Sequence, residues 1–141
     1  MKQIYFACSI RGGRDDAKTY ESLVSHIKNR AIVLSEIFAD QKLTPNGSPA
    51  ASRDIHAGDL AWVRQADAII AEVTSPSLGV GYEIAKAEEW GKPVLALFRD
   101  DGTRKLSAMI GGSPETLTIN YHQLDEAYDA IDTFISSVTT N

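Results

Sequence analysis

Short apolar segments alternate along the chain with longer segments in which apolar residues recur every three or four positions. The short segments are typical of strands buried in a sheet, and the longer ones of helices that pack one face against it. Residues 38–51 contain Pro-Asn-Gly and Ser-Pro and favour a loop. The pattern predicts strands at residues 3–8, 31–36, 67–73, 93–98 and 116–121, helices at residues 14–30, 52–66, 79–91 and 123–138, and a short helix at residues 103–110.

This alternation predicts a parallel sheet, because the chain must cross over, usually through a helix, between parallel neighbours. Right-handed crossovers then give a doubly wound α/β fold of the Rossmann or flavodoxin kind, with helices on both faces of the sheet. We expect a single catalytic domain over residues 1–141, with its five strands in the order 2-1-3-4-5. In such sheets the ligand lies beyond the carboxyl ends of the strands, at the point where the strand order reverses. In this chain the loops expected at that point are residues 9–14 and 74–81.

Two acidic residues interrupt the apolar faces of predicted helices. At roughly 100° per residue, Asp59 falls inside the apolar arc of helix 52–66, and Glu83 inside that of helix 79–91. A carboxylate on a core-facing stripe is costly to desolvate unless it is paired or used. The acidic residues of helix 123–138 all fall outside its apolar stripe, so the placement is not general in this chain. The pattern indicates a reaction site.

Each residue of this predicted site has two interpretations. Glu83, in the first turn of its predicted helix, is a candidate nucleophile, or else it satisfies backbone amides. Asp59 is a candidate general acid, since a neighbouring ionised carboxylate raises its pKa, or else a structural residue that caps a loop. Tyr5, in the middle of the first strand, either belongs to the core or orients Glu83 through its hydroxyl.

The two loops at the switch point are candidate anion sites. Ser9-Ile10-Arg11-Gly12-Gly13-Arg14 follows the first strand, and its backbone amides, Ser9 hydroxyl and arginines could hold a phosphate. The alternative is a tight turn with solvated arginines. The loop 74–81 offers Ser77 as the donor of a second cradle, or else forms an N-capping loop. Neither loop matches the dinucleotide fingerprint or the P-loop.

Composition narrows the choice of ligand. The chain has a net charge of −5 without a cluster of basic residues, so a nucleic-acid polymer is not expected as a partner. Apolar runs fall short of the ~18 residues that span a membrane. Cys8 is the only cysteine and favours a reducing, cytoplasmic location, where we expect a buried, inert thiol. His56 and His122 lack metal-ligand spacing and are interpreted as structural.

Taken in order and spacing, several strings in residues 3–112 closely resemble the 2′-deoxynucleoside 5′-monophosphate N-glycosidases, the Rcl family, which are relatives of the nucleoside 2-deoxyribosyltransferases. The strings are Tyr5-Phe6, Ser9 to Arg14, Ile55-His56, Asp59-Leu60, Trp62, Ala66-Asp67, Ala71 to Thr74, Pro76 to Glu83, and Leu106 to Ile110.

The resemblance implies hydrolysis of deoxynucleoside 5′-monophosphates to a free base and 2-deoxyribose 5-phosphate, without metal or cofactor. Glu83 matches the nucleophile that attacks C1′, Asp59 the proton donor to the base, and Tyr5 the hydroxyl that positions the nucleophile. A homodimer is implied, because Ser107 matches a serine that the neighbouring subunit supplies. The positions that match substrate-binding residues are Ser9, Ile10, Arg11, Gly12, Ser77, Gly79, Ser107 and Met109.

Three positions depart from the family pattern. Cys8 stands where a glycine is expected, Ile37 where a histidine is expected, and Gly111 where an arginine is expected. These departures bear on base preference and on the strength of phosphate binding.

Two other functions stay open. One is a deoxyribosyltransferase that passes the sugar to a second base, and the other is a non-catalytic nucleotide-binding module on the same fold.

Overall fold

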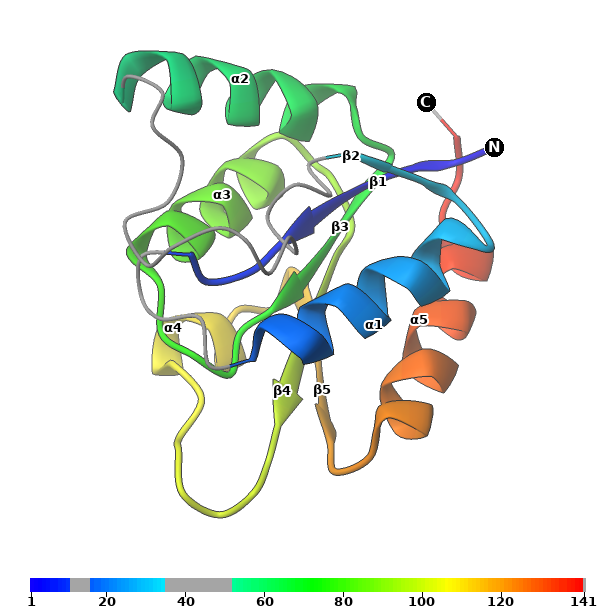
Figure 1. The fold of residues 1–141 in the computed structure, drawn as a ribbon. Helices are drawn as coiled ribbons and strands as arrows, with labels where there is room; N and C mark the ends of the chain where they lie inside the picture. Colours follow the sequence, from blue (N-terminus) through cyan, green and yellow to red (C-terminus); the bar gives the residue numbers. More distant parts are fainter. Residues whose placement is uncertain (11–15, 35–51, 141) are drawn as a thin grey trace.

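The computed structural model describes residues 1–10, 16–34 and 52–140, and the predicted loop 38–51 and Ile37 lie outside them. Its five-stranded parallel sheet has the order β2-β1-β3-β4-β5, which confirms the predicted fold (Figure 1). The strands are β1 Gln3–Ala7, β2 Ile32–Leu34, β3 Ala68–Glu72, β4 Val94–Arg99 and β5 Thr116–Tyr121, and the helices are α1 Ala17–Lys28, α2 Ser52–Gln65, α3 Leu78–Glu89, α4 Ala108–Gly111 and α5 Leu124–Ser137.

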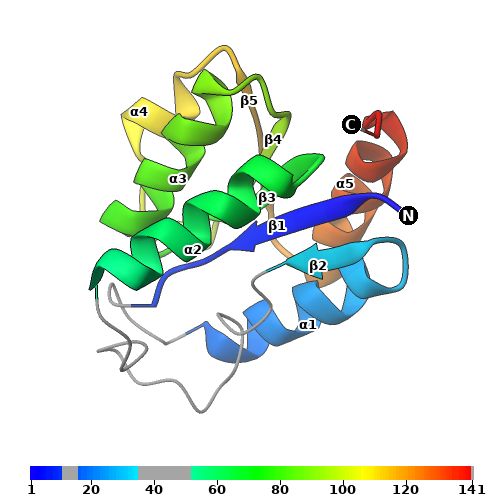
Figure 2. The same cartoon turned by 90° about the horizontal axis from the view of Figure 1, so that it is seen from above.

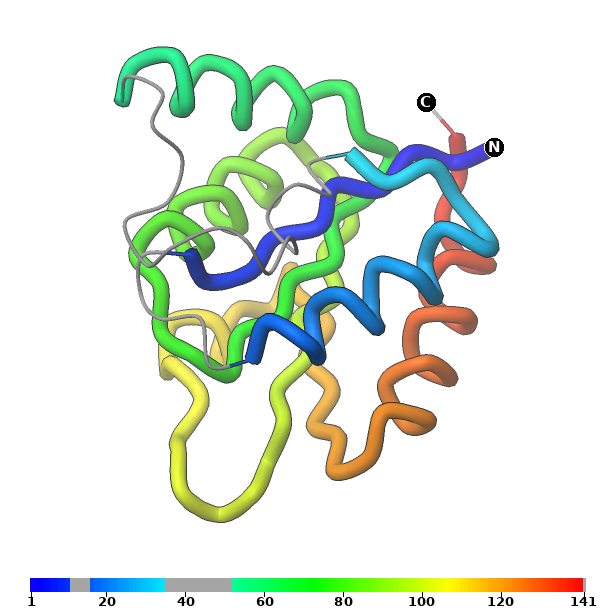
Figure 3. Tube along the Cα trace, in the orientation of Figure 1, coloured from blue at the N-terminus to red at the C-terminus, as the bar shows by residue number. Residues whose placement is uncertain are grey.

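Helices cover both faces of the sheet, as Figures 1 to 3 show in ribbon and trace. Helices α1 and α5 pack on one face over side chains such as Ile4, Phe6 and Leu95. Helices α2, α3 and α4 lie on the other face, over Tyr5, Ile69 and neighbouring residues. Because successive strand residues point to opposite faces, β1 contributes side chains to the apolar core on each face of the sheet. In the part of the chain that the structure describes, no helix is long and apolar enough to cross a membrane.

The predicted start of the short helix over residues 103–110 was wrong, because α4 begins only at Ala108. A local turn explains the difference. The Asp101 carboxylate accepts hydrogen bonds from the backbone N–H and the hydroxyl of Thr103, and Gly102 has a φ of +82°. This geometry prevents a helix from starting at residue 103, since an Asx turn competes with helical hydrogen bonding.

A buried polar network fixes the chain where β3 ends. The Glu72 carboxylate is 1% exposed and accepts hydrogen bonds from the Thr74 backbone N–H, the Thr74 hydroxyl and the Tyr121 hydroxyl. The Thr74 hydroxyl oxygen in turn accepts from the Arg99 backbone N–H. The network ties the carboxyl ends of β3, β4 and β5 together, so the loop that leads into α3 starts from a fixed point.

Candidate active site

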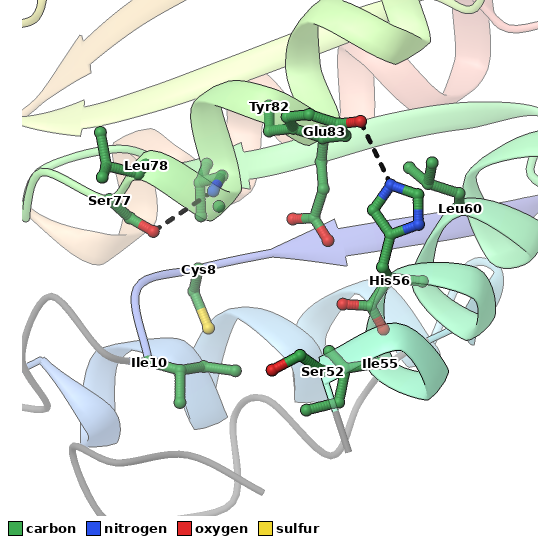
Figure 4. A pocket seen from close by; sticks show the side chains of 13 residues that line it. Cys8, Ile10, Ser52, Ile55, His56, Leu60, Ser77, Leu78, Tyr82 and Glu83 are labelled. Atoms are coloured by element: carbon green, nitrogen blue, oxygen red, sulfur yellow. Dashed lines mark hydrogen bonds between the residues drawn. The ribbon is translucent and has the colours of Figure 1, made fainter. Parts of the chain in front are cut away.

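A pocket of about 430 Å³ lies between the N-terminal halves of α2 and α3, beside the segments that follow β1 and β3 (Figure 4). Its position agrees with the predicted switch point, and its volume is in the range of about 300–1,000 Å³ usual for small-molecule sites. The lining residues come from the end of β1 (Cys8, Ile10), from α2 (Ser52, Ile55, His56, Asp59, Leu60) and from the start of α3 (Ser77, Leu78, Gly79, Val80, Tyr82, Glu83).

Glu83 points from α3 into this pocket, and the Tyr5 hydroxyl donates a hydrogen bond to its Oε2. The ring of Tyr5 is fully buried in the core, so both interpretations of this tyrosine apply at once. The prediction that Glu83 lies in the first helical turn was wrong. Because α3 begins at Leu78, Glu83 is its sixth residue, and the field of a helix N-terminus fades within the first turn. Tyr5, rather than the helix end, orients the carboxylate.

Asp59 and Glu83 meet across the pocket, within hydrogen-bonding reach of each other. Burial is the main reason that the pKa of Glu83 is raised, to about 8. The Tyr5 hydrogen bond opposes that shift, and the Asp59 carboxyl adds to it. Burial also raises the pKa of Asp59, against the hydrogen bond with Glu83 and the nearby His56 charge. Near neutral pH Glu83 is therefore largely protonated, beside the Asp59 carboxyl.

Ser77 stands at the other end of the pocket and caps α3. Its Oγ accepts a hydrogen bond from the Val80 backbone N–H at 3.2 Å, which confirms the capping interpretation of the loop. The hydroxyl proton stays available for a ligand. The first backbone N–H groups of a helix have no intrahelical partner, so those of Leu78 and Gly79 add two donors for an anion.

The other positions predicted for the site differ in where they lie. Ile10 and Gly79 line the pocket, whereas the side chain of Ser9 is fully buried beside it, and its Oγ has no hydrogen-bond partner among the described residues. Arg11 and Gly12 lie outside the described residues.

Ser107 and Met109 also lie away from the pocket, at α4. Ser107 precedes the helix as its N-cap, and Met109 is 85% exposed. Gly111, at the end of α4, packs close to the flexible side chain of Leu106. A Cβ atom there would lie 2.9 Å from the Leu106 side chain, which would have to shift.

His56, which the sequence analysis interpreted as structural, lines the pocket. The imidazole is exposed at the pocket, and its Nε2 lies 3.1 Å from the Tyr82 hydroxyl oxygen. A signal for this placement is present in the sequence. His56 precedes Asp59 by three positions, and residues three apart share one face of a helix. No role was predicted for Tyr82, because Glu83, the next residue in sequence, was the one interpreted as functional.

The carboxyl pair makes a prediction about stability. The folded pKa of Glu83, about 8, exceeds its ordinary value of 4.5, so its contribution to stability is complete below pH 4.5 and is lost as the pH rises through 8. Replacing Glu83 by glutamine removes this loss. We expect Glu83→Gln to be more stable than wild type by roughly 1–3 kcal/mol at pH 8 and by little at pH 4.5, measured by denaturant unfolding.

Glu126→Gln is the matched control, since hydrogen bonds from the Gln123 and His122 backbone N–H groups lower the pKa of this exposed carboxylate. Its stabilising effect is present above the ordinary pKa and is lost as the pH falls, so this variant is expected to be less stable than wild type at pH 8. A Glu83→Gln variant with the same excess stability at both pH values would contradict the inferred protonation of the pair.

Comparison with known proteins places these observations in a family context. The model of the family described as nucleoside 2-deoxyribosyltransferase matches residues 4–124. A mouse protein named 5-hydroxymethyl-dUMP N-hydrolase is 53% identical over 114 residues, which are 79% of this chain and 66% of the mouse protein. The chain thus spans just under two thirds of that relative. A protein of the same name from Tetraodon nigroviridis is 41% identical over 139 residues, covering 96% of this chain and 98% of the fish protein.

Solved structures give the same fold at much lower identity. A CMP N-glycosidase from Clostridium botulinum superposes with a TM-score of 0.67 at 16% identity, covering 94% of this chain and 99% of that one. A conserved protein from Enterococcus faecalis gives a TM-score of 0.65 at 20% identity, covering 94% and 98%. At such identities the likeness extends to the fold alone.

Proposed function

This chain belongs to the nucleoside 2-deoxyribosyltransferase family, and we propose that it is a hydrolase of 2′-deoxynucleoside 5′-monophosphates, releasing the free base and 2-deoxyribose 5-phosphate. The observation that carries the proposal is the carboxyl pair at the pocket, with Tyr5 bonded to Glu83 and Asp59 within reach of it. The relatives named 5-hydroxymethyl-dUMP N-hydrolase support the choice of a nucleotide as substrate.

In the first proposed step, a carboxylate oxygen of Glu83 attacks C1′ of the deoxyribose. The bond from C1′ to the base nitrogen breaks, and its electron pair leaves with the base. Asp59 gives its proton to the base, while the Tyr5 hydroxyl holds Glu83 in its attacking orientation. Because the pKa of Glu83 is raised to about 8, the proton lies on Glu83 before the reaction and must first pass to Asp59 across their contact. The pair then provides one carboxylate and one acid together.

In the second proposed step, water attacks C1′ and the bond to the Glu83 oxygen breaks. Asp59, now ionised, takes a proton from the water, so both carboxyl groups return to their starting forms. Retaining glycosidases work in the same way and keep their two carboxyl groups close, whereas inverting enzymes leave room for a water molecule between them. The contact between Asp59 and Glu83 favours the retaining route.

We assign the 5′-phosphate to the end of the pocket at Ser77, where a hydroxyl and the first amides of α3 can bind an anion. This assignment favours the hydrolase over a deoxyribosyltransferase of unphosphorylated nucleosides, which is the second candidate function. A non-catalytic nucleotide-binding module is disfavoured, since a pure anion binder gains nothing from two acids beside a phosphate. Arg11 of the loop after β1 is proposed as a further phosphate ligand, together with Ser9, Ile10 and Gly12 of that segment.

We further propose a cytoplasmic homodimer. Ser107 and the exposed Met109 lie outside the pocket of their own chain, so they could reach a substrate only in a second copy. The buried thiol of Cys8 suits a reducing compartment.

Base release from a panel of substrates tests the function. Chromatography would follow each common deoxynucleoside 5′-monophosphate, its ribonucleotide counterpart and its unphosphorylated nucleoside, with and without a second free base. We expect release from the deoxy 5′-monophosphates and no transfer to the added base. Transfer between unphosphorylated nucleosides would instead establish the transferase, and binding without turnover would establish the non-catalytic module.

The phosphate assignment predicts the behaviour of Ser77→Asp. Aspartate is as good an N-cap as serine, so the free energy of unfolding is expected to stay close to that of wild type. The new carboxylate repels the phosphate and removes a hydroxyl donor, so KM is expected to rise on the order of 10- to 100-fold. Ser77→Ala is the complement, because it loses the cap as well as the donor. An unchanged KM in Ser77→Asp would contradict the phosphate site.

A further inference from the structure

The pocket has chemically different ends, as Figure 4 shows. Ser77 and Leu78 lie at one end, Glu83 lies between, and His56 and Leu60 lie at the other end. A nucleotide is also asymmetric, with the phosphate on one side of the C1′ carbon and the base on the other. If the phosphate lies at Ser77 and C1′ at Glu83, the base must occupy the end at His56.

His56 and Tyr82 bridge α2 and α3 at this end. The His56 Nε2 and the Tyr82 hydroxyl oxygen are 3.1 Å apart, and the rings meet edge to face, with centroids 5.6 Å apart and planes 67° apart. Tyr82 is 49% exposed, and His56 is exposed as well. An exposed hydrogen bond adds little to stability, so the fold gains little from this pair.

The surroundings of the pair are largely apolar. Ile55 and Leu60 of α2 line the same region of the pocket and can contact the faces of a planar base. The imidazole and the phenol are polar groups at this end, together with Asp59 and with Ser52, which lies beside Ile55. Both can donate or accept a hydrogen bond, the imidazole according to its tautomer. They can therefore exchange their mutual hydrogen bond for bonds to a ligand.

We propose that His56 and Tyr82 are specificity-determining residues that hydrogen-bond the polar edge of the base and so rank the bases that the enzyme releases. The inference rests on the proposed hydrolase function and deepens it. The ligand chemistry is that of a nucleobase with an exocyclic oxygen or nitrogen on the edge remote from the glycosidic bond. A sugar phosphate without a base gains nothing from the pair.

Tyr82→Phe is the decisive variant, because it removes one oxygen atom and keeps the ring. His56→Ala is less clean, since the charge of His56 also lowers the pKa of Asp59. The measurements are kcat/KM for each deoxynucleoside 5′-monophosphate and the inhibition constant of 2-deoxyribose 5-phosphate. We expect the ratio of kcat/KM between the best and the worst base to fall about three- to tenfold in Tyr82→Phe, with the inhibition constant unchanged.

Tyr128→Phe is the matched control. Tyr128 also pairs with a histidine, stacking on His26 with ring centroids 4.1 Å apart, but it does so between α5 and α1 on the other face of the sheet. This variant is expected to keep the wild-type ratio between bases.

Three outcomes would overturn the inference. An equal loss of kcat/KM for all bases, or a parallel rise in the inhibition constant, would mean that Tyr82 only shapes the pocket. Wild-type kcat/KM values for every base would place the base elsewhere. A wild-type protein that releases no base would overturn the proposed function, and this inference with it. That failure differs from the first two outcomes, because both of them require a wild-type protein that releases base.

Discussion

Replacing Glu83 by glutamine is expected to abolish base release, lowering kcat on the order of 10⁴-fold or more, because an amide cannot attack C1′ and form the covalent intermediate. The amide oxygen can still accept the hydrogen bond from Tyr5, so the geometry of the pocket is preserved. Substrate affinity, measured by titration calorimetry, is expected to stay within about tenfold of wild type, since the substitution leaves the phosphate end untouched.

Glu89→Gln is the control for this variant. Glu89 belongs to the same helix but is exposed, and its carboxylate pairs with Lys86 at the surface. We expect wild-type base release from it. Substantial activity in Glu83→Gln would mean that another group is the nucleophile, or that water attacks C1′ directly.

Asp59→Asn is expected to lower kcat by about 10²–10⁴-fold on natural nucleotides, since the departing base then lacks its proton donor. The loss should depend on the leaving group. A 2-deoxyribose 5-phosphate carrying an acidic phenol in place of the base needs no proton to depart, so Asp59→Asn is expected to retain the first step on this substrate. Burst kinetics of phenol release would measure it.

Two comparisons sharpen the assignment of the acid. Glu83→Gln is expected to be inactive on both kinds of leaving group, because it lacks the nucleophile. Asp54→Asn, which changes an exposed residue of the same helix α2, is expected to behave as wild type. An Asp59→Asn variant equally impaired with base and phenol would show that Asp59 positions the sugar instead of donating a proton.

Much of the molecule could be predicted from patterns with a fixed period. Alternating apolar segments gave the parallel sheet and its order, and the helical period put Asp59 and Glu83 on inward faces. The carboxyl ends of parallel strands lie at one edge, so the position of the pocket followed from the topology. Tyr5 was harder, since the same buried position serves packing and the hydrogen bond to Glu83.

The remaining features depend on side-chain geometry, which the spacing of apolar residues along the sequence does not predict. The side chain of Ser77 caps α3 and fixes its start at Leu78, and Glu83 lies in the second turn whether the helix is counted from residue 78 or from residue 79. The turn at Asp101 delays α4 through hydrogen bonds between side chain and backbone. The contact between His56 and Tyr82 joins two helices, and its existence depends on how α2 and α3 pack side by side.

The central claim is that Glu83 forms a covalent bond to the deoxyribose. Mass spectrometry tests it most directly, on enzyme mixed with a deoxynucleoside 5′-monophosphate, quenched in acid during turnover and digested. The account predicts that the peptide containing Glu83 gains the mass of 2-deoxyribose 5-phosphate less one water, and that Glu83→Gln gains nothing. Base release that proceeds without any such adduct, or with the adduct on another residue, would contradict it.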